Sequence, residues 1–303
     1  MLLAEAIAYA AIAFWLNFLY GWSYAEVAAG AVALALAGRI AIVCASQALA
    51  YACASPRPPE HRIGPGAAAA MVLREWRAAA AVNLYRFPFE YSSLRPDPQP
   101  RRGERIPVML VHGYFSNRGY FGPLARALEA RGVEPLFAPD FSAMLATIER
   151  FAGELHGEIE RIVAGTGQSK VVLVCHSMGG LAARAYLAAR GEARIAKLVT
   201  IGSPHHGTVH AALGAGANAR QMHPASEFLE SLRRHEADNA PAVPATSIYM
   251  PHDNLVAPQD SSRLEWAKNV ALPGFGHIEV LHSQRLADLL VKELREAGVE
   301  AAG

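Results

Sequence analysis

Residues 170–190 read KVVLVCHSMGGLAARAYLAAR, and this stretch decides the fold. Its first part, Lys170–Cys175, is a continuous apolar and β-branched run, which is typical of a buried strand. A helix is predicted almost at once, at Gly180–Arg190, and Gly191 supplies its usual C-terminal stop. The tight turn between them carries Ser177. A strand, a tight turn and a helix together present such a serine at the top of a sheet.

Outward from this stretch, short apolar runs alternate with amphipathic stretches from Ile106 to the C-terminus. This alternation predicts an α/β fold with a mainly parallel sheet covered by helices on both faces. We expect strands at Ile106–Val111, Val133–Ala138, Lys170–Cys175, Ile195–Ile201, Ser247–Met250 and Asn269–Leu272, and helices at Phe121–Arg131, Thr147–Ala164, Gly180–Arg190 and Ser283–Ala297.

The composition excludes several classes of protein. Of the 303 residues 52% are hydrophobic and 18% are charged, so the chain has ample apolar surface for a core and is not disordered. The 28 basic and 27 acidic side chains leave a net charge of +1, which predicts no nucleic-acid partner. The cysteines Cys44, Cys53 and Cys175 are too few and too scattered for a disulfide framework or a zinc site.

Residues 1–54 differ from the rest, because Glu5, Glu26 and Arg39 are their only charged residues. Two apolar runs separated at Gly21-Trp22-Ser23 predict a helical hairpin that attaches the protein to a membrane. Folding back about Trp22 places Glu5 and Arg39 at equal depth, each 17 positions away, where they can neutralise one another. Ile40–Ala54 then lies on the membrane surface or continues toward the α/β body. An alanine-rich helical pair packed on the protein itself or on a second subunit is the alternative.

A region rich in proline and arginine follows at residues 55–105 and contains one predicted helix, Ala67–Leu84. It carries nine arginines against five acidic residues, and such positive flanks favour the cytoplasmic side of a membrane. A hairpin agrees with this preference, because both of its ends lie on the cytoplasmic side. A single span would instead place the α/β body on the opposite side of the membrane. We therefore expect three parts: a membrane hairpin at 1–54, a connecting region at 55–105 and an α/β domain at 106–303.

Two loops of the predicted domain carry groups suited to acyl transfer. Ser177 lies in Cys175-His176-Ser177-Met178-Gly179-Gly180, and Val111-His112-Gly113-Tyr114 closes the first strand. A tetrahedral intermediate needs two backbone N–H donors aimed at its oxyanion. Met178, after the serine, is expected to supply one donor, and Tyr114, after the His-Gly pair, the other. A serine helix cap and an ordinary glycine turn are the structural alternatives.

Together with Thr200–Thr208, Asp253–Pro258 and Gly274–His277, these motifs resemble the bacterial triacylglycerol lipase and esterase branch of the α/β-hydrolase fold. The resemblance runs from Ile106 to the C-terminus and leaves residues 1–105 outside. Cys175 departs from it, since the family has glycine or alanine at that position. The resemblance implies an α/β-hydrolase fold and lipase or carboxylesterase activity through a Ser-His-Asp triad and an acyl-enzyme, without a cofactor or metal.

The other two members of that triad are argued from the chemistry. A serine becomes a good nucleophile when a histidine takes its proton, and the histidine needs an acid that fixes its tautomer. In this fold the chain order is serine, acid, histidine. Asp253 follows a predicted strand and is preferred to Asp260 as the acid. His277 lies in a glycine-flanked loop that can reach Ser177, and it is preferred to His282, which begins a helix.

Other conspicuous residues receive structural interpretations. His176 is expected to point away from Ser177 and brace the turn. His205, His206 and His210 are expected to be polar loop residues, because histidines at this spacing without cysteine or glutamate nearby seldom bind a metal. Residues 210–240 lie where related lipases carry a lid over the site, and a long surface excursion is the alternative.

The sequence thus predicts a membrane-associated serine ester hydrolase that acts on a lipid or other carboxylic ester. Residues 1–54 attach it to the membrane, which we expect to be the bacterial inner membrane. The sequence leaves open on which side of this membrane the α/β domain lies. A thioesterase or an acyltransferase would use the same residues. A catalytically silent hydrolase fold that serves as a membrane scaffold is a third class.

Overall fold

The computed structural model describes residues 2–94, 96–103, 105–142 and 144–300. The chain divides into two compact units, Met1–Ala45 and Ser46–Gly303. The strands of the larger unit are β1 (Val108–Val111), β2 (Leu136–Phe137), β3 (Val171–His176), β4 (Ile195–Ile201), β5 (Ala245–Tyr249) and β6 (Lys268–Ala271). Its α-helices are α3 (Pro65–Ala81), α4 (Glu90–Ser93), α5 (Gly122–Glu129), α6 (Ile148–Thr166), α7 (Met178–Arg190), α8 (Gly216–Gln221), α9 (Glu227–Asp238) and α10 (Gln284–Glu296).

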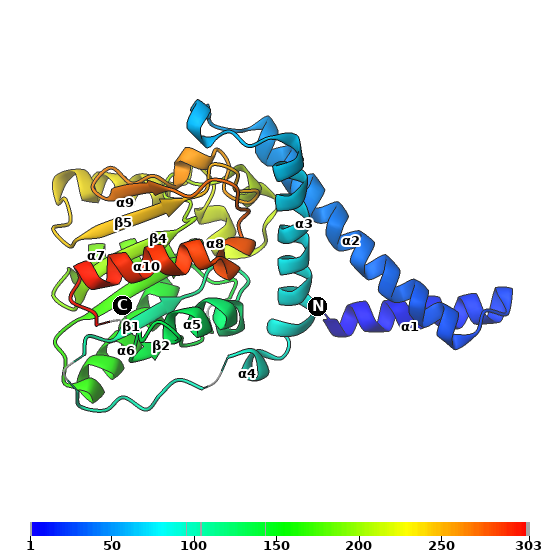
Figure 1. Ribbon diagram of the computed structural model, residues 1–303, viewed down its shortest axis with the longest axis horizontal. Coiled ribbons are helices and arrows are strands. Elements are labelled where there is room, and N and C mark those ends of the chain that lie inside the picture. The colour runs from blue at the N-terminus through cyan, green and yellow to red at the C-terminus, as the bar shows by residue number, and fades with distance from the viewer. Residues whose placement is uncertain (1, 95, 104, 143, 301–303) are drawn as a thin grey trace. The chain divides into compact units, whose positions relative to one another are not determined.

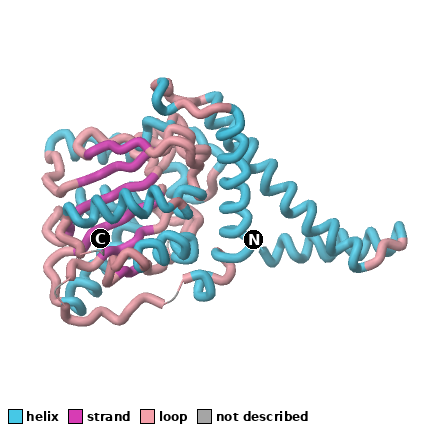
Figure 2. The backbone as a smooth tube through the Cα atoms, viewed as in Figure 1, coloured by secondary structure: helices cyan, strands magenta, loops and turns pink. Residues whose placement is uncertain are grey.

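Six strands form one sheet in the order β2-β1-β3-β4-β5-β6, and every neighbouring pair is parallel. Figures 1 and 2 show helices on both sides of this sheet. The predicted α/β architecture is therefore confirmed. Because the carboxyl ends of parallel strands open at one edge, the loops after β1, β3, β5 and β6 lie along the same edge of the sheet.

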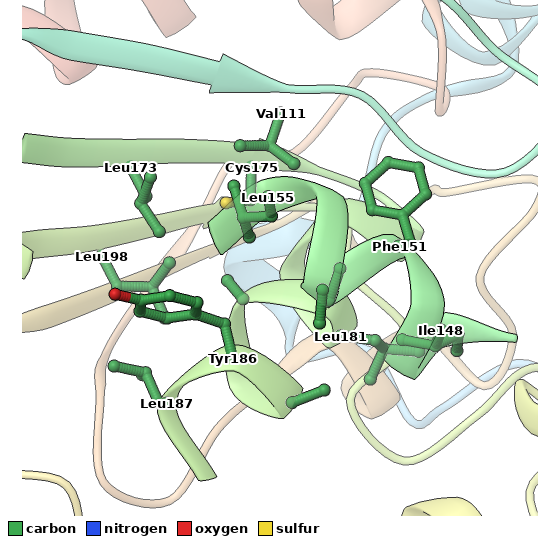
Figure 3. Close-up of a cluster of buried hydrophobic side chains, with 14 of the residues drawn as sticks. Val111, Ile148, Phe151, Leu155, Leu173, Cys175, Leu181, Tyr186, Leu187 and Leu198 are labelled. Carbon is green, nitrogen blue, oxygen red and sulfur yellow. The ribbon is translucent and has the colours of Figure 1, made fainter. Parts of the chain in front are cut away.

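Successive side chains of each strand point to opposite faces of the sheet. In β3, Leu173 and Cys175 face the cluster that contains α6 and α7, whereas Val172 and Val174 face the cluster that contains α5 and α10. The first cluster is drawn in Figure 3, where side chains of α6 and α7 surround Leu173, Cys175 and Leu198. A strand buried on both faces must be apolar throughout, which explains the run at residues 171–175.

Local signals set several helix boundaries. Helix α6 begins after Thr147, whose side chain accepts a hydrogen bond from the Arg150 N–H, and it ends at Gly167 in the left-handed conformation (φ 73°). Pro65 occupies the first turn of α3, a position that needs no N–H donor. Helix α3 stops at Ala81 and continues as one turn of π-helix, η2 (Val82–Arg86).

Several element boundaries differ from prediction, and two of the differences have a local cause. Helix α7 starts at Met178, two residues before the expected Gly180, because the backbone reverses at Ser177 alone. Strand β2 has only two residues where six were expected, since Pro135 has no N–H to donate to a neighbouring strand. The remaining connections contain the short 3₁₀ turns η1 (Pro59–His61), η3 (Arg118–Phe121), η4 (Val209–Leu213), η5 (Gln259–Ser262) and η6 (Glu279–His282).

Two helices precede the α/β body, α1 (Leu2–Tyr20) and α2 (Tyr24–Ala52). The helical conformation is interrupted between them, at the predicted turn. Gly21 is left-handed there (φ 68°), and the Glu26 carboxylate accepts hydrogen bonds from the N–H and the hydroxyl of Ser23. The predicted Glu5–Arg39 pairing cannot be followed, because the Glu5 side chain lies outside the described residues.

Helix α2 runs without interruption through Gly38 and Arg39 to Ala52. In the part of the chain that the structure describes, it is the one helix long and apolar enough to cross a membrane, and Ala10–Tyr20 is a shorter apolar helix. The last residues of α2, Ser46–Ala52, belong to the larger unit. The course of residues 40–54 along a membrane surface stays a prediction.

Candidate active site

Ser177 sits on a strained turn at the carboxyl end of β3. Its φ of 56° is unusual for a residue with a side chain, and such strain concentrates at functional sites. The turn is possible because small residues surround it: a Cβ on Gly179 would lie 2.5 Å from the Val111 carbonyl oxygen. Cys175, which replaces the small residue of the lipase motif, is fully buried in the core behind the turn. This is the strand-turn-helix arrangement that presents a serine hydroxyl above a sheet.

The loop after β1 lies directly against this turn. A Cβ on Gly113 would be 2.8 Å from the Ser177 Cβ and 3.1 Å from the Met178 backbone nitrogen. Beside it, Phe115 adopts a positive φ of 46°. The Tyr114 hydroxyl donates to the Ala215 carbonyl at 2.8 Å, so this side chain is engaged by the segment that follows β4. The loop that contains Tyr114 therefore meets the start of α7 at Met178, beside Ser177.

An imidazole and a carboxylate are paired on the loops after β5 and β6. His277 Nδ1 and Asp253 Oδ2 lie 2.9 Å apart, and the two side chains are 6% and 1% exposed. The other carboxylate oxygen of Asp253 accepts hydrogen bonds from the Leu255 and Val256 N–H groups, both at 2.8 Å. Burial opposes the charged imidazolium, but Asp253 outweighs it, so the pKa of His277 is raised above its usual value.

The two rival residues face other partners. Asp260 is exposed, and its N–H donates to the Ser55 hydroxyl at 2.9 Å. His282 Nε2 lies 2.5 Å from Arg86 Nη1, and burial together with that guanidinium lowers the pKa of His282 to about 4. The structure therefore brings Asp253 together with His277 and places neither rival in that pair.

His176 is buried beneath the same pair. Its Nε2 lies 3.0 Å from the His277 carbonyl oxygen, and the two imidazole rings are 4.7 Å apart. Burial, reinforced by the neighbouring His277, holds the pKa of His176 well below its usual value. A neutral ring can donate one hydrogen bond without bringing a charge into the site. His176 thus supports the loop that carries His277.

The cluster of histidines after β4 is dispersed among different partners. His205 Nε2 lies 3.0 Å from Thr200 Oγ1, His206 Nε2 lies 3.1 Å from the Arg263 carbonyl, and His210 Nε2 lies 3.2 Å from the Ser46 carbonyl. No group of three or more histidine, cysteine, aspartate or glutamate side chains suited to a metal ion occurs among the described residues.

One residue beside the pair was missed by the sequence analysis. Asn254 Oδ1 accepts a hydrogen bond from the His277 N–H at 3.0 Å, and its Nδ2 donates to the Ser46 hydroxyl at 3.0 Å. Asn254 therefore ties the acid loop to the histidine loop and to the end of α2. Its position immediately after Asp253 was the only signal available, and a neighbouring asparagine does not by itself indicate such a contact.

Residues 210–240 form η4, α8 and α9, and an ion pair fastens α9 to α7. Arg184 donates to Glu236 through Nε and Nη2 at 2.7 and 2.8 Å, and the two side chains are 2% and 10% exposed. Arg184 also donates to the His205 carbonyl at 2.8 Å. This part of the segment is an anchored helix.

Comparison with known proteins covers most of the α/β body. Residues 108–295 match the model of the alpha/beta hydrolase family. The chain is 34% identical over 116 residues to a triacylglycerol lipase of Pseudarthrobacter phenanthrenivorans, a match that covers 34% of each chain. It is also 34% identical over 116 residues to a triacylglycerol lipase of Burkholderia plantarii, covering 34% of this chain and 31% of the relative. The chain thus spans about a third of the length of these curated relatives.

Among solved structures, the crystal structure of Aspergillus fumigatus lipase B is similar, with a TM-score of 0.55 and 24% identity. The similarity covers 63% of this chain and 52% of the lipase. At this identity the likeness concerns the fold alone. The matched region begins at β1, so α3 and everything before it lie outside the family model.

Proposed function

The chain belongs to the alpha/beta hydrolase family, and we propose that it is a membrane-associated serine ester hydrolase of the lipase and carboxylesterase branch. The observation that carries the proposal is the buried hydrogen bond of 2.9 Å between His277 and Asp253, on the loops beside the strained turn of Ser177. The similarity to two triacylglycerol lipases supports a carboxylic ester as substrate.

In the proposed reaction, the Ser177 hydroxyl oxygen attacks the ester carbonyl carbon while His277 Nε2 takes the hydroxyl proton. Asp253 keeps the Nδ1 proton on His277 and stabilises the imidazolium. The backbone N–H groups of Tyr114 and Met178 receive the negative charge that develops on the carbonyl oxygen, an effect of about 3–4 kcal/mol for one donor in other enzymes.

His277 then gives its proton to the leaving alcohol, which leaves an acyl group on Ser177. Water attacks this acyl-enzyme by the same route in reverse, with His277 as the base, and the carboxylic acid departs. The cycle returns the serine, the histidine and the aspartate to their starting protonation states. It requires no cofactor.

Membrane association is the second part of the proposal. Helix α2 has the length and apolar composition of a membrane span. Within the larger unit, Leu73, Tyr85 and Phe89 expose about half or more of their surfaces on the segment after α2. Exposed aromatic residues beside arginines are typical of a protein surface that meets lipid head groups. A lipid ester dissolved in the membrane would be a suitable substrate.

The proposal is tested with a fluorophosphonate probe and with Ser177→Ala. The probe should label the wild-type protein on Ser177, and the variant should lose the label and all hydrolysis of p-nitrophenyl esters. Its melting temperature should remain that of the wild type, because the deleted hydroxyl has little part in the fold. Ser169→Ala, on an exposed loop residue, is the matched control and should retain full activity.

Three outcomes would contradict the proposal. Turnover retained in Ser177→Ala would remove this serine from the mechanism. A wild-type protein that is folded but never labelled would instead support a silent scaffold. Labelling without ester turnover, followed by faster reaction with thioesters or with an added alcohol acceptor, would indicate the thioesterase or acyltransferase.

A further inference from the structure

The loop that carries His277 is held by a side chain that precedes the region matched by the family model. Glu75, on α3, is 1% exposed and accepts hydrogen bonds from the Ile278 N–H at 3.1 Å and the Glu279 N–H at 2.8 Å. These are the two residues that follow His277. The free N–H groups at the start of η6 are thereby satisfied by a carboxylate that lies 203 residues earlier in the chain.

The preceding residue of α3 holds the two ends of the same loop. Arg74 donates through Nε to Glu279 Oε2 at 2.7 Å and through Nη2 to the Gly274 carbonyl at 2.8 Å. The Glu279 carboxylate in turn accepts a hydrogen bond from the Gly276 N–H at 3.2 Å. The loop from Gly274 to Glu279 is therefore fastened at both ends by one turn of α3.

The loop is also closely packed between α3 and the acid loop. A Cβ added to Gly276 would lie 2.6 Å from Glu75 Oε2 and 3.0 Å from Asn254 Oδ1. Glycine is therefore required at position 276 for the close approach of the carboxylate. Glu75 on one side and Asn254 on the other leave the backbone of His277 little freedom to move.

We propose that Glu75 is a positioning residue for the reaction: its carboxylate holds the loop that keeps His277 against Asp253, where His277 is to accept the proton of Ser177. This inference rests on the proposed function, because it assigns Glu75 a role in the same hydrolytic site. It also makes α3 part of the structure that supports the site, although α3 precedes the region matched by the family model.

The charge of Glu75 provides a second way to detect this role. Burial raises the pKa of Glu75 to about 7, against the opposing effect of the two N–H donors and of nearby His277. Asp253, His277 and the Arg74–Glu279 ion pair are the charged or titratable groups around it. The negative charge of Glu75 contributes to the raised pKa of His277, after the larger effect of Asp253.

The experiment compares Glu75→Gln with Glu60→Gln in the full-length chain. Glutamine has nearly the same shape, but its amide group turns a donor toward one of the two N–H groups, so the loop loses an acceptor. We expect kcat to fall about tenfold or more with KM within about twofold, since small displacements of a catalytic group are costly. The loss of charge should also move the acidic limb of the pH profile of kcat/KM to lower pH. Glu60 is exposed, and its variant should match the wild type in both respects.

A purely structural role for Glu75 would lower the melting temperature of Glu75→Gln and leave the kcat and pH profile of its folded fraction unchanged, and that result would overturn the inference. If Glu75→Gln does not fold, the Arg74→Gln variant tests the inference instead. Arg74 is half exposed, so its replacement should be tolerated by the fold, and its loss releases the same loop. An unchanged kcat in Arg74→Gln would then refute the inference. Failure of the proposed function is distinguishable, because in that case the wild type itself lacks ester turnover.

Discussion

At the scale of single residues, the pKa values of buried histidines in this protein are shifted in opposite directions. Burial lowers the pKa of His112 to about 4, and its Nε2 accepts a hydrogen bond from the Phe141 N–H at 3.3 Å. His176 is likewise held neutral. His277 is equally buried, yet its pKa is raised, because a carboxylate contacts its Nδ1. A buried imidazole thus becomes a usable base only where an acid accompanies it.

Asp253→Asn is expected to lower kcat by about 10³- to 10⁴-fold, the loss seen when the acid of a serine protease triad is replaced by its amide. The asparagine oxygen can still accept from the Leu255 and Val256 N–H groups, so the fold should be preserved. Its amide would face His277 Nδ1 and favour the wrong tautomer. Steady-state hydrolysis of p-nitrophenyl butyrate measures the change. Asp260→Asn is the matched control, and a similar loss in that variant would show that the acid has been misassigned.

The activity should also depend on pH in a defined direction. His277 must be neutral to accept the serine proton, so kcat/KM should fall as the pH is lowered through its raised pKa, that is, from above about 6.5. Because Asp253 is the main group that raises this pKa, the residual activity of Asp253→Asn should decline at lower pH than the wild type. An acidic limb that does not move in this variant would contradict the assignment of His277 as its partner.

At the scale of elements, the ion pair between α7 and α9 bears on whether α9 is an anchored helix or part of a moving lid. Removing one partner of a buried ion pair typically costs about 3–5 kcal/mol, because the other charge is left uncompensated. We expect Glu236→Ala to lower the free energy of unfolding in urea by an amount near the lower end of this range. Arg233→Ala breaks only the exposed pair with Glu230 on the same helix and should leave the unfolding midpoint unchanged. Equal midpoints for the two variants would mean that α9 is not held by Arg184.

At the scale of the whole molecule, the two compact units suggest where the membrane attachment can be removed. Deletion of residues 1–45 is expected to release the protein into the soluble fraction with its kcat retained, since all residues of the larger unit remain. Sedimentation of membranes and ester hydrolysis measure the two properties. A full-length protein that is already soluble would contradict membrane attachment.

A longer deletion, of residues 1–57, provides the contrast. It removes the Ala50 carbonyl that accepts from Gln259 at 3.3 Å and the Ser46 hydroxyl that accepts from Asn254 at 3.0 Å. Gln259 also donates to the Asp253 carbonyl at 3.0 Å, so the acid loop should loosen. We expect this truncation to lose several-fold in kcat relative to the shorter one. Equal activity of the two truncations would show that the end of α2 does not support the site.

The sequence alone determined the features that depend on a few neighbouring residues. The apolar run at 171–175 required a strand buried on both faces, and the small residues after Ser177 allowed the tight turn into α7. Parallel strands then brought the loops with Gly113, Asp253 and His277 to one edge, because strand direction decides where loops emerge. Their catalytic roles remain predictions for the experiments above.

Only the tertiary structure decided which side chains surround these loops. The sequence favoured Asp253 over Asp260 and His277 over His282 by their places relative to a strand and a helix, but only the folded chain shows that Asp253 and His277 are in contact. Glu75 reaches Glu279 across 204 positions, and Asn254 reaches Ser46 across 208. Helical and strand periodicities act over a few residues, whereas such hydrogen bonds depend on how whole elements pack. No pattern near Glu75 indicates that its carboxylate will be buried against the loop of His277.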